Sequence, residues 1–85
     1  MKIWLKVFRG DKTLRHKTFF TDDDVSVDEF LRALRKCTSA IDVPTPIMLD
    51  AHVKRFNNFG VVRFYPDDFV EEVGFDKMEL EIMRK

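Results

Sequence analysis

The side chains best suited to catalysis or metal binding in this chain are two histidines, one cysteine and two groups of acids. His16 and His52 stand far apart in the sequence, and neither a His-x-x-x-His nor a Cys-x-x-Cys spacing occurs, although zinc sites commonly use such spacings. Cys37 is the single cysteine, so it has no partner for an internal disulfide. We therefore expect no metal centre and no cofactor.

The acids form one group at residues 22–24 and another at residues 67–72. Neither group has the alternating ligands and the glycine of a calcium-binding loop. We interpret the first group as a polar loop before a helix and the second as the solvent face of a short helix. An enzymatic role would require His52 or Cys37 to meet the second group in a pocket, so we expect that the protein is not an enzyme.

The composition fits one small folded domain that spans residues 1–85. Hydrophobic residues make up 45% of the chain and charged residues 35%, which excludes a disordered tail and a membrane span. Fifteen basic residues balance fifteen acidic ones, so no net charge draws the whole chain to nucleic acid or to a membrane. The lone cysteine and the absence of a signal peptide indicate a cytoplasmic protein.

The first twenty residues predict a β-hairpin. In residues 2–8, Ile3, Leu5 and Val7 alternate with polar and aromatic residues, which is the period of a half-buried strand. Gly10 and Asp11 suit a tight reversal before a second strand at residues 13–20. The pattern leaves open whether the even-numbered or the odd-numbered residues of this second strand face the core.

The clearest local signals predict a helix over residues 27–41. Ser26 can cap the backbone N–H of Glu29 while the Glu29 carboxylate returns to the N–H of Ser26, and Val25 can pack on Phe30. Helical spacing also places a set of apolar residues on one stripe that would face a sheet. These residues are Val27, Phe30, Leu31, Leu34, Cys37 and Ile41.

The second half of the chain predicts shorter elements. Residues 47–49 form a buried strand or a connector, and residues 61–65 and 77–82 form strands, the last with Met78, Leu80 and Ile82 pointing inward. For residues 50–60 we favour a short helix that is capped by Asp50 and ends at Gly60, with a hairpin at Asn57-Asn58 as the alternative. A further helix is expected at about residues 67–72.

These elements predict an α+β fold, in which a mixed sheet of four to five strands packs on one main helix, with one or two short extra helices. If the last strand lies beside the first, Glu79 and Glu81 meet Lys2 and Lys6. With a right-handed crossover through the helix, the pattern resembles the ubiquitin-like β-grasp domains, through the opening at residues 1–6, the turn at Gly10, the central helix and the closing strand at residues 78–82. The chain does not end in the Gly-Gly pair of conjugated modifiers, so the resemblance implies no conjugation chemistry.

One face of the predicted hairpin alternates aromatic and basic side chains, and it is our candidate binding surface. It comprises Lys2, Trp4, Lys6, Phe8, Arg15 and Lys17. We expect a non-catalytic protein-interaction module of the adaptor or regulatory type, with a protein partner, no membrane association, and a monomeric or weakly dimeric state.

The alternative function is nucleic-acid binding through the same cationic and aromatic face, where bases could stack and phosphates could be neutralised. Against this alternative we favour a simpler interpretation. In that interpretation Glu79 and Glu81 neutralise the lysines, and a loop or residues 66–75 cover Trp4 or Phe8.

Overall fold

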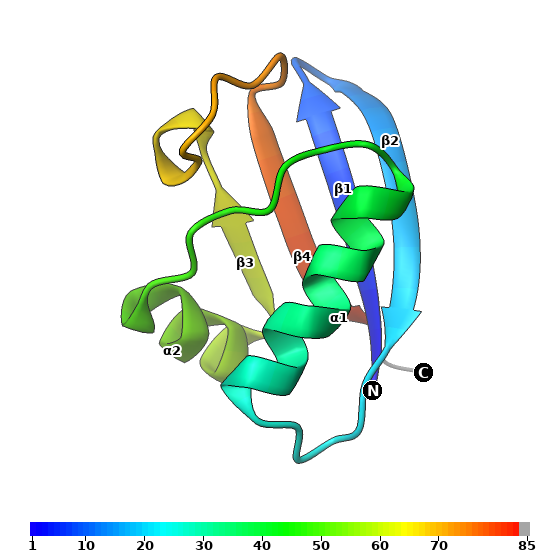
Figure 1. Cartoon of the computed structure of the whole chain (residues 1–85), viewed down its shortest axis with the longest axis vertical. Coiled ribbons are helices and arrows are strands. Elements are labelled where there is room, and N and C mark those ends of the chain that lie inside the picture. Colours follow the sequence, from blue (N-terminus) through cyan, green and yellow to red (C-terminus); the bar gives the residue numbers. More distant parts are fainter. Residues whose placement is uncertain (84–85) are drawn as a thin grey trace.

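The computed structural model describes residues 1–83 and has an α+β fold. One sheet holds four strands in the order β2-β1-β4-β3. The strands are β1 (Lys2–Arg9), β2 (Lys12–Phe20), β3 (Val61–Phe64) and β4 (Lys77–Met83). The two helices, α1 (Val27–Ala40) and α2 (Asp50–Phe59), both lie on one face of this sheet (Figure 1).

The first and last strands are neighbours, as the sequence predicts, but the sheet is antiparallel and not mixed. Lys6 lies opposite Glu79, and all three neighbouring strand pairs are antiparallel. A right-handed crossover joins parallel strands, so the predicted crossover is not present and the β-grasp arrangement is not confirmed. Residues 47–49 are a connector and add no fifth strand. The N–H of Ile47 donates a hydrogen bond to the carbonyl of Asp68 at 2.8 Å.

The core lies between the helices and the near face of the sheet. Alternate residues of β1 and β4 supply its floor, because a strand places every second side chain on the same face. As predicted, Met78 and Leu80 are fully buried on this face and Ile82 is partly buried beside them. Phe64 is the largest of the fully buried side chains, which places β3 firmly within the same core.

The N-terminus of α1 is capped by Ser26, as its sequence predicts. The Ser26 hydroxyl accepts a hydrogen bond from the Glu29 N–H at 3.2 Å. The Glu29 carboxylate does not return to the backbone of Ser26, because it accepts a hydrogen bond from the same hydroxyl at 3.2 Å. Phe30, Leu34 and Cys37 are buried as expected, whereas Val27, at the first turn of the helix, is half exposed and does not belong to the buried stripe.

We expect Ser26→Ala to lower the free energy of unfolding by about 1 kcal/mol, since it removes an N-cap acceptor. Urea denaturation measures this change. Ser39→Ala, near the other end of α1, is the matched control and should shift stability by less than about 0.5 kcal/mol. Equal effects of the two substitutions would contradict the role of the cap.

Residues 50–59 form a helix, so the alternative hairpin at Asn57-Asn58 is wrong. The helix buries Phe56 against Phe30, with ring centroids 5.4 Å apart. Gly60 ends it in the left-handed conformation at φ 73°, which glycine adopts without strain. The predicted cap, Asp50, is instead the first helical residue, and Leu49 is the N-cap residue. The N–H of Leu49 donates a hydrogen bond to Nδ1 of His52 at 3.0 Å.

The helix expected at residues 67–72 is reduced to one short 3-10 turn, η1 (Pro66–Asp68). The backbone is already extended at Phe69, with ψ at 143°. Phe69 and Phe75 are both buried, and their rings meet edge to face at 5.2 Å. Burying two aromatic side chains outweighs the few hydrogen bonds that a second helical turn would add.

Candidate functional site

Trp4, Lys6 and Phe8 lie on the face of the sheet opposite the helices, because Ile3, Leu5 and Val7 point into the core. We call this the open face. Within residues 1–83 the structure places no helix against it (Figure 1). The open face is formed by the alternate residues of all four strands. Its members are Lys2, Trp4, Lys6, Phe8, His16, Thr18, Phe20, Val61, Arg63, Lys77, Glu79, Glu81 and Met83.

A compact ion-pair network occupies the centre of the open face. Lys6 Nζ lies 3.0 Å from Glu79 Oε1 and 3.1 Å from Glu81 Oε1. Arg63 Nε donates to Glu79 Oε2 at 2.8 Å. The same Lys6 Nζ also lies 4.1 Å from the centroid of the Trp4 ring, which is within cation–π distance. Glu79 is only 8% exposed, so this carboxylate is largely enclosed by its partners.

The two central groups of this network, Glu79 and Lys6, have shifted pKa values. Burial by itself would raise the pKa of Glu79, but the hydrogen bonds and charges of Lys6 and Arg63 outweigh burial and hold it below its usual value. Burial would likewise lower the pKa of Lys6, but Glu79 and Glu81 outweigh it and raise that pKa. Both side chains therefore stay charged at neutral pH, and Lys6 is already paired.

The structure corrects the predicted membership of the binding surface. Arg15 and Lys17 lie opposite Val7 and Leu5 of β1, so their side chains are on the helix side of the sheet and not on the open face. The Arg15 guanidinium donates to the carbonyl of Ile41 at the end of α1. Lys2, Trp4, Lys6 and Phe8 do share the open face, as predicted.

The predicted ion pairs of Glu79 and Glu81 are confirmed for Lys6 and wrong for Lys2. Glu79 and Glu81 were both expected to reach Lys2 and Lys6, but both pair with Lys6, while Lys2 lies opposite Met83. Of residues 66–75, Phe69 and Phe75 pack into the core on the other side of the sheet, while Trp4 and Phe8 are half-buried on the open face. Phe20, at 71% exposed, is a member of the open face that the sequence analysis did not single out.

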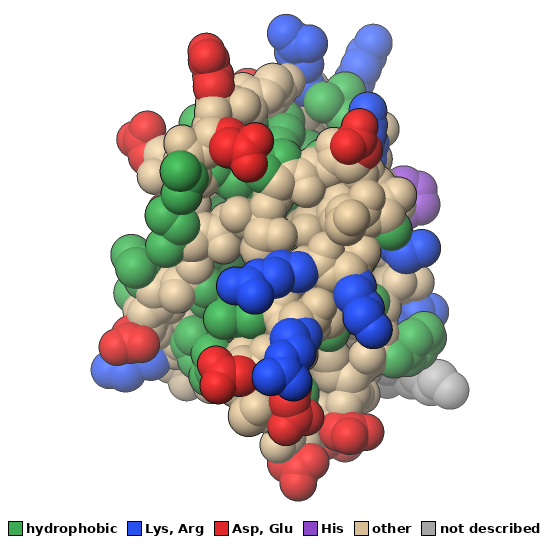
Figure 2. Space-filling view, viewed as in Figure 1, with side chains coloured by type: hydrophobic (Ala, Val, Ile, Leu, Met, Phe, Trp, Pro, Cys, Tyr) green, Lys and Arg blue, Asp and Glu red, His purple; other side chains and the backbone are tan. Residues whose placement is uncertain are grey.

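A shallow groove of about 470 Å³ separates the helix side of β2 from α1. Lys17 and Phe19 line it from β2. Arg32, Lys36 and Cys37 line it from α1. Figure 2 shows Lys and Arg side chains gathered over α1 and along the right-hand edge, where β2 runs. This groove, which we call the β2–α1 groove, is therefore mainly cationic above an apolar floor.

The residues with catalytic potential have structural contacts. His52 Nε2 approaches Asp68 Oδ1 at 3.7 Å, so one histidine does meet an acid of the 67–72 group. Its Nδ1 accepts a hydrogen bond from the N–H of Leu49, the N-cap residue of α2. Its ring packs on that of Phe64, with the two ring centroids 4.7 Å apart. Cys37 is 2% exposed, and burial raises the pKa of its thiol although the charge of Lys17 acts in the opposite direction.

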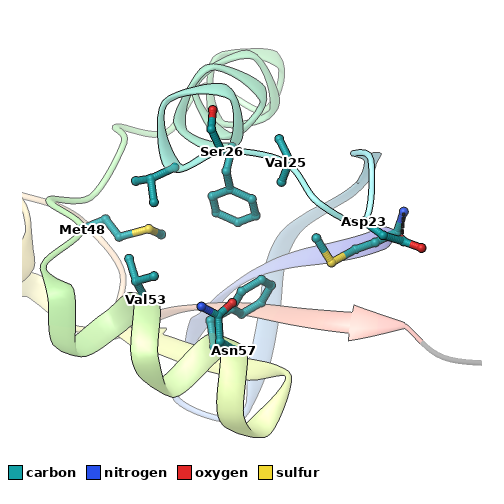
Figure 3. A pocket seen from close by; sticks show the side chains of 10 residues that line it. Asp23, Val25, Ser26, Met48, Val53 and Asn57 are labelled. Carbon is teal, nitrogen blue, oxygen red and sulfur yellow. Dashed lines mark ion pairs between the residues drawn. The ribbon is translucent and has the colours of Figure 1, made fainter.

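A small apolar pocket opens between the start of α1 and α2 (Figure 3). Val25 contributes from the loop before α1, Met48 from the connector, and Val53 and Asn57 from α2. Its volume is about 110 Å³, whereas sites for small molecules usually enclose roughly 300 to 1,000 Å³. We interpret it as a packing gap between the two helices.

Over residues 1–83, no three histidine, cysteine or acidic side chains are grouped so that they could hold a metal ion. Neither helix in that range has the length and apolar character needed to span a membrane. No known protein-family model, curated protein or solved structure matches the chain.

Proposed function

We propose that this protein is a non-catalytic protein-interaction module that binds its partner through the open face of the sheet. The observation that carries the proposal is that both helices cover one face and leave Trp4, Phe8 and Phe20 on the other. Tryptophan and other aromatic side chains are common anchors of protein interfaces, because they bury a large area with little loss of conformational entropy.

The ion-pair network supports this proposal over catalysis. Lys6 and Arg63 both pair with Glu79 and form a platform of fixed charges beside Trp4. A pre-organised platform lowers the entropy that a partner must overcome on binding. Support for nucleic-acid binding is weaker, because Arg15 and Lys17 lie on the other face and the charge of Lys6 is shared with two carboxylates.

The test is capture of a protein partner by the purified chain, followed by affinity measurements with the identified partner. Trp4→Ala should weaken binding by about 30-fold, the equivalent of a hot-spot contribution near 2 kcal/mol. Phe59→Ala is the control, because Phe59 is an aromatic residue 73% exposed at the end of α2. The proposal fails if both variants fold cooperatively and bind the partner as tightly as the wild type.

A further inference from the structure

The outer edge of β2 is open to another strand. β2 lies at the end of the sheet and, within residues 1–83, it pairs only with β1. Met1 and Thr21, just before β1 and just after β2, exchange hydrogen bonds in both directions. Because bonded and non-bonded pairs alternate along an antiparallel ladder, His16, Thr18 and Phe20 direct their backbone N–H and C=O groups away from β1. An edge of this kind is a template for strand addition.

The β2–α1 groove runs beside this edge. A strand added to β2 would point every second side chain to the helix side of the sheet, where the groove lies. Phe19 is partly buried and Cys37 is buried at its floor, so the base of the groove is apolar. The volume of about 470 Å³ is sufficient for two or three side chains.

The charges around the groove indicate the chemistry of its occupant. Lys17, Arg32 and Lys36 line it, and none of them forms an ion pair with a carboxylate of residues 1–83. Glu29 is the single acid of the lining, and its carboxylate is already bonded to the Ser26 hydroxyl. Three unpaired cations beside unpaired strand hydrogen-bonding groups favour an acidic, extended segment.

We propose that β2 accepts an extended acidic segment of a partner protein as a fifth strand, with alternate side chains in the β2–α1 groove. This inference rests on the proposed function, because it names the chemistry of a partner for an interaction module. A second copy of this chain is a poorer occupant. Two β2 edges would bring Arg15 and Lys17 of one copy close to the same cations of the other.

The experiment titrates the ¹⁵N-labelled chain with a capped eight-residue peptide that alternates valine and glutamate. We expect amide shifts in β2 and in the part of α1 that lines the groove. The outward amides of β2 should also gain protection from hydrogen exchange. A peptide with lysine in place of each glutamate should cause no such shifts. The inference is overturned if both peptides act alike or if the shifts fall outside this region.

Matched variants separate the backbone contribution from the charge contribution. Thr18→Pro removes one outward N–H from an edge strand, where proline is tolerated, and it should abolish binding, whereas Thr18→Ala should bind as the wild type does. The double variant Arg32→Glu/Lys36→Glu should bind at least about ten-fold more weakly. Arg35→Glu/Lys54→Glu changes the same net charge outside the groove and should have little effect.

If the proline variant fails to fold, the charge variants still decide the inference, because Arg32 and Lys36 are exposed on a helix. Wild-type affinity of Arg32→Glu/Lys36→Glu would overturn it. So would shifts in β2 that depend on protein concentration without peptide, since these would identify a second copy as the occupant. Loss of partner binding in Trp4→Ala without any peptide binding would leave the proposed function standing and remove only this inference.

Discussion

Replacing Phe64 with alanine is expected to lower the free energy of unfolding by about 3 to 5 kcal/mol. Phe64 is fully buried at the end of β3, opposite Met78 of β4. Its ring also packs on the ring of His52, with the two centroids 4.7 Å apart, so Phe64 joins the sheet to α2. A domain of this length is stabilised by roughly 4 to 13 kcal/mol in total, so this one cavity removes a large share.

Urea denaturation followed by circular dichroism measures this loss. Phe59→Ala is the matched control, because it deletes the same atoms from a side chain that is 73% exposed, and it should change stability by less than about 0.5 kcal/mol. A loss of under 1 kcal/mol for Phe64→Ala would mean that α2 and β3 do not pack as the structure shows.

The elements that the sequence predicted correctly depend on local signals. The period-two alternation of residues 2–8 and 77–82 and the capping residue Ser26 act within a few residues of chain, so they can be recognised without knowing the fold. The prediction of a helix at residues 67–72 was wrong for the opposite reason. Phe69 and Phe75 are drawn into a core that other segments build, and this contact overrides local preference.

The candidate binding surface was predicted in part because β1 is unambiguous and β2 is not. Aromatic side chains occur on both sides of β2, at Phe19 and at Phe20, so its alternation does not reveal the buried face. The register is also irregular, since the pairing shifts between Val7 and Phe8 and leaves Leu14 as an extra residue. The pairing of β2 with β1 places Arg15 and Lys17 on the helix side, and no local pattern contains that information.

The second large effect is expected at Glu79, whose carboxylate joins Lys6 to Arg63 across three strands. Glu79→Gln keeps the shape of the side chain but removes the charge that both cations face. Lys6 still pairs with Glu81, so we expect the free energy of unfolding to fall by about 2 to 4 kcal/mol. This loss is larger than that of one charged hydrogen bond and smaller than that of a fully broken buried ion pair. Glu81→Gln is the control. Its carboxylate is 44% exposed and has a single cationic partner, so we expect a loss below about 1 kcal/mol.

The pH dependence of the stability difference between wild type and Glu79→Gln identifies the cause of that difference. The pKa of Glu79 is lower in the folded chain than in the unfolded chain, so its charge adds stability above the ordinary glutamate pKa near 4.5. That contribution is lost as the pH falls through the lowered folded value. The stability difference between wild type and Glu79→Gln should therefore be full at pH 7 and should shrink below pH 4.5.

The alkaline side tests the same network through Lys6. Its pKa is raised by Glu79 and Glu81, so its contribution is fully present below the ordinary lysine value of 10.5 and is lost only as the pH rises through the higher folded value. The difference in free energy of unfolding between wild type and Glu79→Gln should then be constant from neutral pH to about pH 10. Urea denaturation at pH 3, 7 and 10 measures the three points. A difference that is the same at pH 3 and pH 7 would show that Glu79 stabilises the sheet by packing and not by its charge, and the open face would then lack the fixed ionic platform that the proposed function uses.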